Sequence, residues 1–134
     1  MLISTKGRYA LRVMIDLAEN NTGEYIPLKD IAGRQEISLK YLESIMVLLS
    51  KSKLIDGAHG KGGGYRLNRD AKDYKVGEII KIADGTLAPV ACLEENAPCC
   101  QRAEACRTLP LWKGLDKVVS EYLDGFTLYD LTKK

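Results

Sequence analysis

All four cysteines of the chain lie in one short stretch, CLEENAPCCQRAEAC, which runs from Cys92 to Cys106. Six residues separate Cys92 from Cys99, Cys100 follows directly, and five residues separate Cys100 from Cys106. Thiolates are preferred ligands of iron–sulfur clusters and zinc, and they also carry redox chemistry. Because the rest of the chain has no cysteine, this grouping predicts ligands or reactive thiols rather than small buried side chains.

The spacing of the thiols excludes two common motifs. A zinc ribbon uses two C-x2–4-C knuckles and a thioredoxin-like site uses C-x-x-C, and neither pattern occurs here. Adjacent residues such as Cys99 and Cys100 are expected to point in divergent directions, so they rarely bind one tetrahedral ion together. Three thiolates separated by loop-length gaps can surround an iron–sulfur cluster. A thiol switch that holds no metal, or a site for another metal, is the open alternative.

Length and composition indicate the size of the fold and the cellular compartment in which the thiols act. The chain has 134 residues, 46% of them hydrophobic, which predicts one domain with a real core or a small domain with an extension. It has no apolar run near the length of a membrane span, and its start, MLISTKGRYAL, lacks the apolar core of a signal peptide. We therefore expect a cytoplasmic protein with no membrane segment, whose thiols are kept reduced.

The charge is uneven along the chain. Residues 1–75 carry 13 Lys/Arg and 9 Asp/Glu, whereas residues 76–134 carry 7 and 9, so the net charges are +4 and −2. A basic first part predicts contact with an anionic partner. No nucleophile–base pair accompanies the single histidine, so an enzyme is not expected.

The basic part is predicted to form a helix-turn-helix unit. Apolar residues recur at helical spacing over residues 5–20, behind a cap at Ser4 or Thr5. A short helix is expected from Pro27 over 28–34, and Ser38 caps a third helix over residues 39–51. The expected inward face of the third helix is Leu42, Ile45, Met46 and Leu49, and its outward face is Lys40, Tyr41, Glu43 and Ser44.

A glycine-rich hairpin follows the third helix, in the sequence LIDGAHGKGGGYRLN. Glycines at its tip permit positive φ angles and close approach to another molecule. A P-loop would need Ser or Thr after Lys61, where Gly62 stands, and a dinucleotide fingerprint that starts at Gly60 fails at Tyr65. The hairpin is therefore predicted to be the wing of a winged helix.

The remaining periodicity completes the expected fold class, which is mainly α with a small β-hairpin. A short helix is expected over 76–84, and the most regular apolar stripe of the chain lies at 111–123. We expect a winged helix-turn-helix domain at 1–84, a cysteine-rich loop at 85–108, and a long dimerisation helix with a tail at 109–134. The last helix could pack against the front domain or against the same helix of a second subunit. A second subunit is the expected partner, because a palindromic DNA site requires two-fold symmetry.

Several motifs together resemble one family, the IscR-type winged-helix regulators. They are ISTKGRYAL, ISLKYLE in the third helix, GKGGGY in the wing, VGEII after it, the cysteine loop, and LW at the start of the last helix. The resemblance covers nearly the whole chain and implies a dimeric, cytosolic, bacterial transcription factor. In the cluster-binding members of that family, a three-cysteine loop holds the iron–sulfur centre. A ferredoxin-like electron carrier is disfavoured as an alternative, because such a protein would not need the predicted wing or the three helices before it.

The resemblance implies that Cys92, Cys100 and Cys106 hold the cluster, with Cys99 as an additional thiol. One branch of the family has a histidine ligand three residues after the third cysteine. Leu109 occupies that position here, and a leucine side chain cannot bind a metal. A [2Fe–2S] cluster is expected in preference to [4Fe–4S]. The fourth ligand stays open among an exogenous group, Cys99, Glu94, Glu95 and Glu104.

The helix-turn-helix and the resemblance also identify the residues expected to contact double-stranded DNA with a roughly palindromic operator. Glu43 is expected to accept a hydrogen bond from a cytosine amino group. Helix N-termini and cations bind phosphates, which position the protein without specifying a sequence. The expected contacts are Lys6, Arg8, Ser38, Lys40 and Lys51 with phosphates, Tyr41, Glu43 and Ser44 in the major groove, and His59, Lys61 and Gly62 in the minor groove.

The function expected from the sequence is a transcriptional regulator whose DNA binding is controlled by the cluster. Its input would be cluster supply, redox state or nitric oxide. The alternative is a winged-helix regulator in which the cysteines form a metal-free redox switch.

Overall fold

The first helix lies at the centre of the head, which is the part of the molecule formed by residues 3–84. The computed structural model describes residues 3–98 and 100–132. Helix α1 (Thr5–Glu19) begins at Ser4, whose hydroxyl oxygen accepts a hydrogen bond from the N–H of Gly7 at 3.0 Å. The cap is therefore Ser4 rather than Thr5. The buried apolar side chains of α1 are Ala10, Val13, Met14 and Leu17, which follow the predicted stripe.

Helices α2 (Leu28–Gln35) and α3 (Leu39–Lys51) form the predicted helix-turn-helix. The turn between them passes through Glu36, which adopts the left-handed conformation with φ 54°. The hydroxyl oxygen of Ser38 caps α3 by accepting a hydrogen bond from the N–H of Tyr41 at 3.2 Å. The four residues expected on the inward face of α3 are all buried: Leu42, Ile45, Met46 and Leu49.

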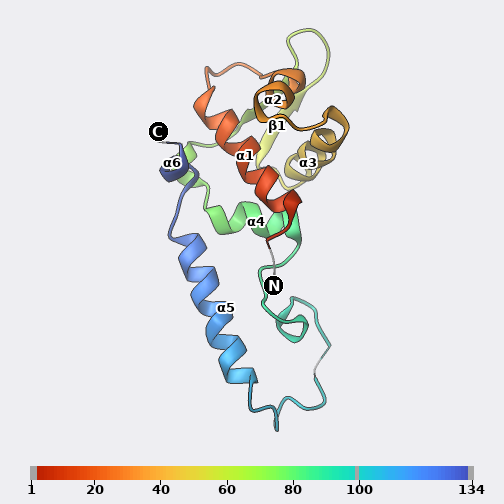
Figure 1. Cartoon of the computed structure of the whole chain (residues 1–134). Helices are drawn as coiled ribbons and strands as arrows, with labels where there is room; N and C mark the ends of the chain where they lie inside the picture. Colours follow the sequence, from red (N-terminus) through yellow and green to blue (C-terminus); the bar gives the residue numbers. More distant parts are fainter. Residues whose placement is uncertain (1–2, 99, 133–134) are drawn as a thin grey trace.

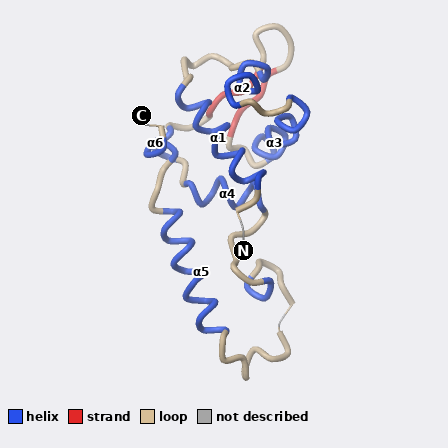
Figure 2. Tube along the Cα trace, in the orientation of Figure 1, coloured by secondary structure: helices blue, strands red, loops and turns tan. Residues whose placement is uncertain are grey.

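The wing consists of the antiparallel strands β1 (Ile55–Ala58) and β2 (Gly64–Leu67), drawn red in Figure 2. Its second strand is also tied to the chain ahead of α2. Ile26 and Tyr65 exchange two backbone hydrogen bonds, of 2.8 and 2.9 Å. Gly64 has φ 145°, and a Cβ atom there would overlap the backbone of Ile26. Only glycine therefore fits where the wing joins the head.

A buried tyrosine joins the wing to the next helix. After the short 3₁₀ turn η1 (Ala71–Asp73), Tyr74 is fully buried and its hydroxyl donates to the carbonyl oxygen of Leu54 at 2.6 Å. Burial raises the pKa of Tyr74 above its ordinary value, so the hydroxyl stays a donor. Helix α4 (Val76–Asp84) follows with the predicted bounds and ends at Gly85, which adopts a positive φ.

The chain then leaves the head and forms an arm (Figure 1). The arm descends through residues 85–108, which contain the 3₁₀ turn η2 (Ala91–Leu93), and returns as α5 (Leu109–Asp124). The short helix α6 (Leu128–Leu131) packs back into the head, where Leu128 is fully buried. The predicted fold class, mainly α with a small hairpin and a long C-terminal helix, is confirmed. Within the described residues, no helix is both long and apolar enough to cross a lipid bilayer.

Candidate nucleic-acid interface and cysteine segment

The outward face of α3 carries the polar residues expected there. Lys40, Glu43, Ser44 and Lys51 are exposed. Tyr41 differs, because its ring packs edge-on against the ring of Tyr9, with centroids 5.7 Å apart and planes at 70°. Its half-buried position leaves only part of the side chain accessible.

The remaining residues expected at the DNA lie at the start of α3, on α1 and in the wing. Ser38 is exposed, and its oxygen already caps the helix, so its O–H remains able to donate to another molecule. Arg8 on α1 is exposed and donates to the hydroxyl oxygen of Thr5 at 2.9 Å, while Lys6 is half-buried. At the tip of the wing, the exposed residues include His59, Lys61 and Gly62.

The orientation of the helix-turn-helix is set by a buried carboxylate that the sequence analysis did not identify. Asp16 on α1 is only 2% exposed and accepts hydrogen bonds from Arg34 at 3.0 and 2.8 Å and from Gln35 at 3.0 Å, both on α2. These bonds raise the pKa of Arg34, which stays a cation. The available signal was an aspartate inside the apolar stripe of α1, since a buried charge requires a partner.

The cysteine segment is irregular, as Figure 2 shows between α4 and α5. Cys92 and Cys100 are exposed, Cys106 is half-buried, and Cys99 lies outside the described residues. The Cys106 Sγ atom lies 3.5 Å from the hydroxyl oxygen of Thr108. Hydrogen bonds from the Thr108 side chain and from nearby backbone N–H groups lower the pKa of Cys106.

The thiols fit an iron–sulfur cluster in chemistry, while the three that the structure describes, Cys92, Cys100 and Cys106, are not arranged as a finished site. Among the described residues, no three His, Cys, Asp or Glu side chains come together as metal ligands. One candidate fourth ligand, Glu95, pairs with Lys81 at 3.9 Å, with both side chains well exposed. A cluster would therefore require residues 85–108 to fold around it, which is compatible with their irregular backbone.

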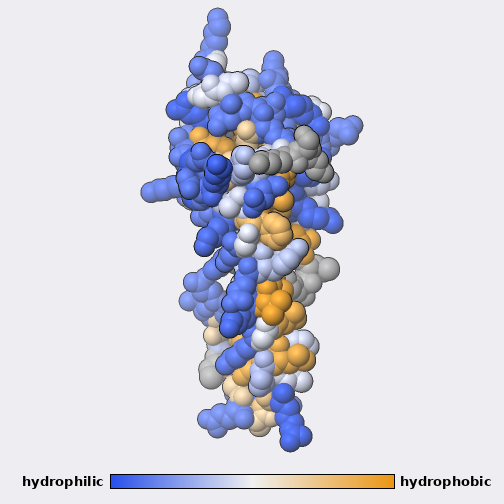
Figure 3. All heavy atoms as spheres, turned by 90° about the vertical axis from the view of Figure 1, so that its left-hand side faces the viewer, coloured by the Kyte–Doolittle hydropathy of each residue, from blue (hydrophilic) through white to orange (hydrophobic). Residues whose placement is uncertain are grey.

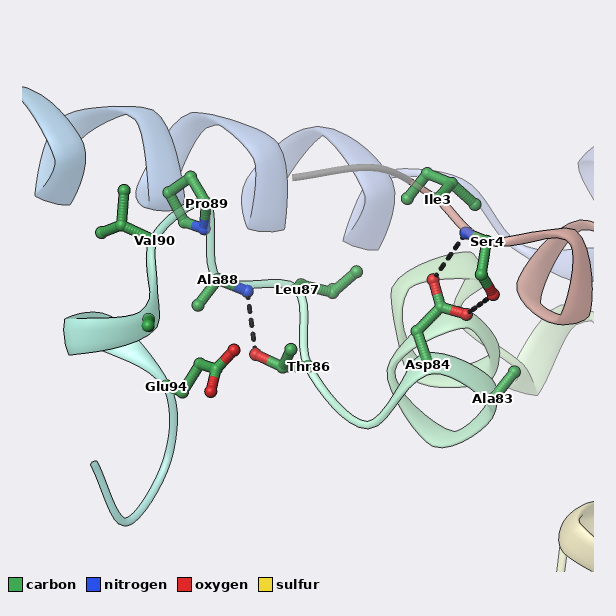
Figure 4. A pocket seen from close by; sticks show the side chains of 11 residues that line it. Ile3, Ser4, Ala83, Asp84, Thr86, Leu87, Ala88, Pro89, Val90 and Glu94 are labelled. Atoms are coloured by element: carbon green, nitrogen blue, oxygen red, sulfur yellow. Dashed lines mark hydrogen bonds between the residues drawn. The ribbon is translucent and has the colours of Figure 1, made fainter.

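The cysteine segment begins beside the first turn of α1. The N–H of Ser4 donates to Asp84 Oδ2 at 3.1 Å, and the hydroxyl of Ser4 donates to Oδ1 (Figure 4). A Cβ atom on Gly7 would lie 2.7 Å from Asp84 Oδ1, so glycine permits this close approach. A cavity of about 430 Å³ opens beside the contact and is lined by residues on both sides of it, Glu94 among them. Hydrogen bonds thus join the residue that precedes the cysteine segment to the start of α1.

Helix α5 leaves an apolar face uncovered. Figure 3 shows hydrophobic atoms gathered along the arm on the side that α5 occupies in Figure 1. The exposed fractions of Val118 and Tyr122 reach 63% and 65%. The large exposed apolar side chains of this face are Leu111, Leu115, Val118 and Tyr122.

Comparisons with known proteins agree with this architecture. The family profile Rrf2, described as an iron-dependent transcriptional regulator, matches residues 3–134. The chain is 39% identical to the protein rrf2 of Nitratidesulfovibrio vulgaris over 133 residues, covering 99% of this chain and 88% of that protein. It is 38% identical to the transcriptional regulator IscR of Escherichia coli over 131 residues, which cover 98% of this chain and 80% of IscR.

A solved structure extends the likeness to three dimensions. The structure of CymR, the global cysteine regulator of B. subtilis, superposes with a TM-score of 0.78 at 35% identity, covering 98% of this chain and 96% of CymR. Since these relatives are regulators of transcription, the expectation that the chain is not an enzyme is confirmed. The chain belongs to the Rrf2 family of winged-helix, DNA-binding transcriptional regulators.

Proposed function

We propose that the protein is a cytoplasmic homodimer that binds a roughly palindromic DNA operator, and that an iron–sulfur cluster on its cysteine segment controls this binding. The observation that carries the proposal is the contact between Asp84 and Ser4. It joins the root of the thiol-bearing arm to the N-terminus of α1, next to the cations expected at the DNA. The proposed division is a reading domain at 1–84, a cluster loop at 85–108, and a dimerisation segment at 109–134.

In the reading domain, α3 enters the major groove. Its N-terminus, with the O–H of Ser38 and the ammonium of Lys40, meets phosphate, as do Lys6, Arg8 and Lys51. The exposed carboxylate of Glu43 accepts a hydrogen bond from a cytosine amino group, a contact worth about 1–3 kcal/mol of discrimination. Tyr41 and Ser44 border this contact, and His59, Lys61 and Gly62 follow the minor groove.

In the cluster loop, Cys92, Cys100 and Cys106 bind iron. The fourth ligand comes from Cys99, from one of the carboxylates of Glu94, Glu95 and Glu104, or from an exogenous group. A set of thiolates suits a [2Fe–2S] centre, which would supply redox chemistry and sensitivity to oxygen or nitric oxide. The lowered pKa of Cys106 favours the thiolate, the form that binds metal. Residues 85–108 would fold around the centre. This folding would strengthen or break the hydrogen bonds between Asp84 and Ser4.

The dimer uses the uncovered face of α5. An apolar helix face of this kind buries its side chains against an identical face when two subunits pair around a two-fold axis. Two reading domains then present two copies of α3 to successive major grooves of one palindrome.

Anaerobic purification tests the cluster and the DNA binding together. We expect a coloured protein that contains iron and acid-labile sulfide, and that selects a palindromic site from a randomised duplex library. Cys92→Ala, Cys100→Ala and Cys106→Ala should each abolish the visible absorbance, and retention in all three would refute the ligand assignment. Glu43→Ala should relax base preference at one position of the site, whereas an unchanged preference would refute its reading role.

A metal-free thiol switch is the second candidate, and two observations favour it. The described thiols are not gathered as metal ligands, and the pKa of Cys106 is lowered by its hydrogen bonds. A colourless anaerobic protein with intact DNA binding that weakens on mild oxidation would support the switch over the cluster.

A further inference from the structure

Two large apolar side chains project from the outward face of α3. Leu39 is 48% exposed and Val47 is 49% exposed, although the inward face of the same helix already fills the core with four other apolar residues. About half of each side chain is accessible and so offers an apolar surface to another molecule. Single exposed apolar residues are common on protein surfaces, so the significance of these two depends on their position beside Glu43.

The two side chains lie in one row with Glu43. Leu39, Glu43 and Val47 are spaced by four residues, so they follow one another along the same side of the helix. Lys40 stands at the start of this surface and Lys51 at its end, both exposed. Beyond Val47 a groove of about 340 Å³ separates α3 from the wing and is lined by Val47, Lys51, Ala58, His59 and Tyr65 with their neighbours.

We propose that Val47 and Leu39 read thymine by packing against its 5-methyl group in the major groove, on either side of the Glu43 contact. This inference rests on the proposed entry of α3 into that groove. Thymine is the only base that offers a methyl group there, and apolar side chains recognise it by contact. Burial of the methyl group against the apolar side chain removes both from water and stabilises the complex with the correct sequence, without any hydrogen bond.

The geometry of the helix limits where these thymines stand. Four residues advance an α-helix by about 6 Å, and successive base pairs advance B-DNA by about 3.4 Å. The methyl groups should therefore lie within roughly two base steps of the base that Glu43 contacts, one towards each side.

A protein partner fits this surface less well than DNA does. The centres of protein interfaces are depleted of charge, whereas here Glu43 separates the two apolar side chains and lysines stand at both ends. The continuous apolar face that a protein partner would require lies on α5 instead. A row in which one acidic group stands between two apolar side chains, with lysines at both ends, matches a groove lined by bases and edged by phosphates.

Replacement of thymine by deoxyuridine tests the proposal, because it removes only the methyl group. The probe is the duplex that the protein itself selects from a randomised library, with each thymine replaced in turn. Wild-type protein should lose about fourfold in affinity at one thymine contacted by Val47, the effect of one buried methyl group. Val47→Ala should bind the thymine and deoxyuridine duplexes within a factor of two of each other at that position, and Leu39→Ala should do so at a second position.

A phosphate-contact variant provides the matched control. Lys40→Ala should weaken binding to both duplexes in equal proportion, so that sensitivity to the methyl group persists. Val47→Ala preserves the fold, because the site is half-exposed and alanine favours helix. If wild-type protein binds its operator equally well with every thymine replaced, this inference is overturned while DNA binding by α3 stands. If no duplex is selected at all, the proposed function itself fails.

Discussion

The carboxylate of Asp84, the last residue of α4, accepts hydrogen bonds from both the N–H and the hydroxyl of Ser4, the residue that caps α1. The two residues are 80 positions apart in the chain. A carboxylate at this place also complements the partial positive charge of the helix N-terminus. The contact holds α1 at the point where the cysteine arm leaves the head.

Asp84→Ala should lower the free energy of unfolding by about 1–2 kcal/mol, because two hydrogen bonds to a charged acceptor are lost at an accessible site. Urea denaturation monitored by circular dichroism measures this change. Asp84→Asn, which retains one acceptor oxygen, should fall between the alanine variant and the wild type. An unchanged midpoint in both variants would show that the contact does not stabilise the head.

Gly64→Ala should destabilise the protein by at least about 3 kcal/mol, because the new Cβ atom would overlap the backbone of Ile26 in a conformation that only glycine adopts readily. Gly60→Ala is the matched control, since Gly60 also has a positive φ but has open space around it. Its cost should be only about 1–2 kcal/mol. Thermal unfolding of the two variants compares the costs, and equal losses would contradict the close approach at Gly64.

Thr108→Val should raise the pKa of Cys106 towards its ordinary value, because the side-chain hydrogen bond from Thr108 is the largest cause of the lowered pKa. A higher pKa leaves less thiolate near neutral pH, so the alkylation of Cys106 by iodoacetamide should slow there. The two proteins should react alike above about pH 10, where both thiols are ionised. Mass spectrometry of the Cys106 peptide from metal-free protein follows the rate, and identical pH profiles would contradict the assignment.

Val118→Glu should weaken self-association by at least about a hundredfold, because a carboxylate would replace an apolar side chain at the proposed subunit interface. Sedimentation velocity across a range of concentrations measures the shift from dimer to monomer. Lys113→Ala, which also changes an exposed side chain of α5, should leave the association unchanged. A Val118→Glu protein that still sediments as a dimer would move the interface away from this face.

Much of the head could be predicted from the sequence, because its signals are local. The bounds of α4 and the cap at Ser38 follow from hydrophobic periodicity and from a side chain that bonds the N–H three residues later. The glycine cluster likewise predicted the wing. The grouping of the cysteines identified the thiols on which the chemistry depends, since residue type and spacing need no folded structure to be seen.

Other features were decided only by the tertiary structure. The burial of Asp16 depends on Arg34 and Gln35 of another helix, and a lone aspartate in a helical pattern gives no sign of them. Helix α6 is too short to show periodicity, and Leu128 is buried only because the chain returns to the head. The sequence by itself thus determined helices α1 to α5, the wing and the set of thiols, because hydrogen bonding and amphipathicity act over a few residues. Packing alone brought Asp84 to Ser4 and left Val47 exposed, because contacts between distant segments depend on how the whole core closes.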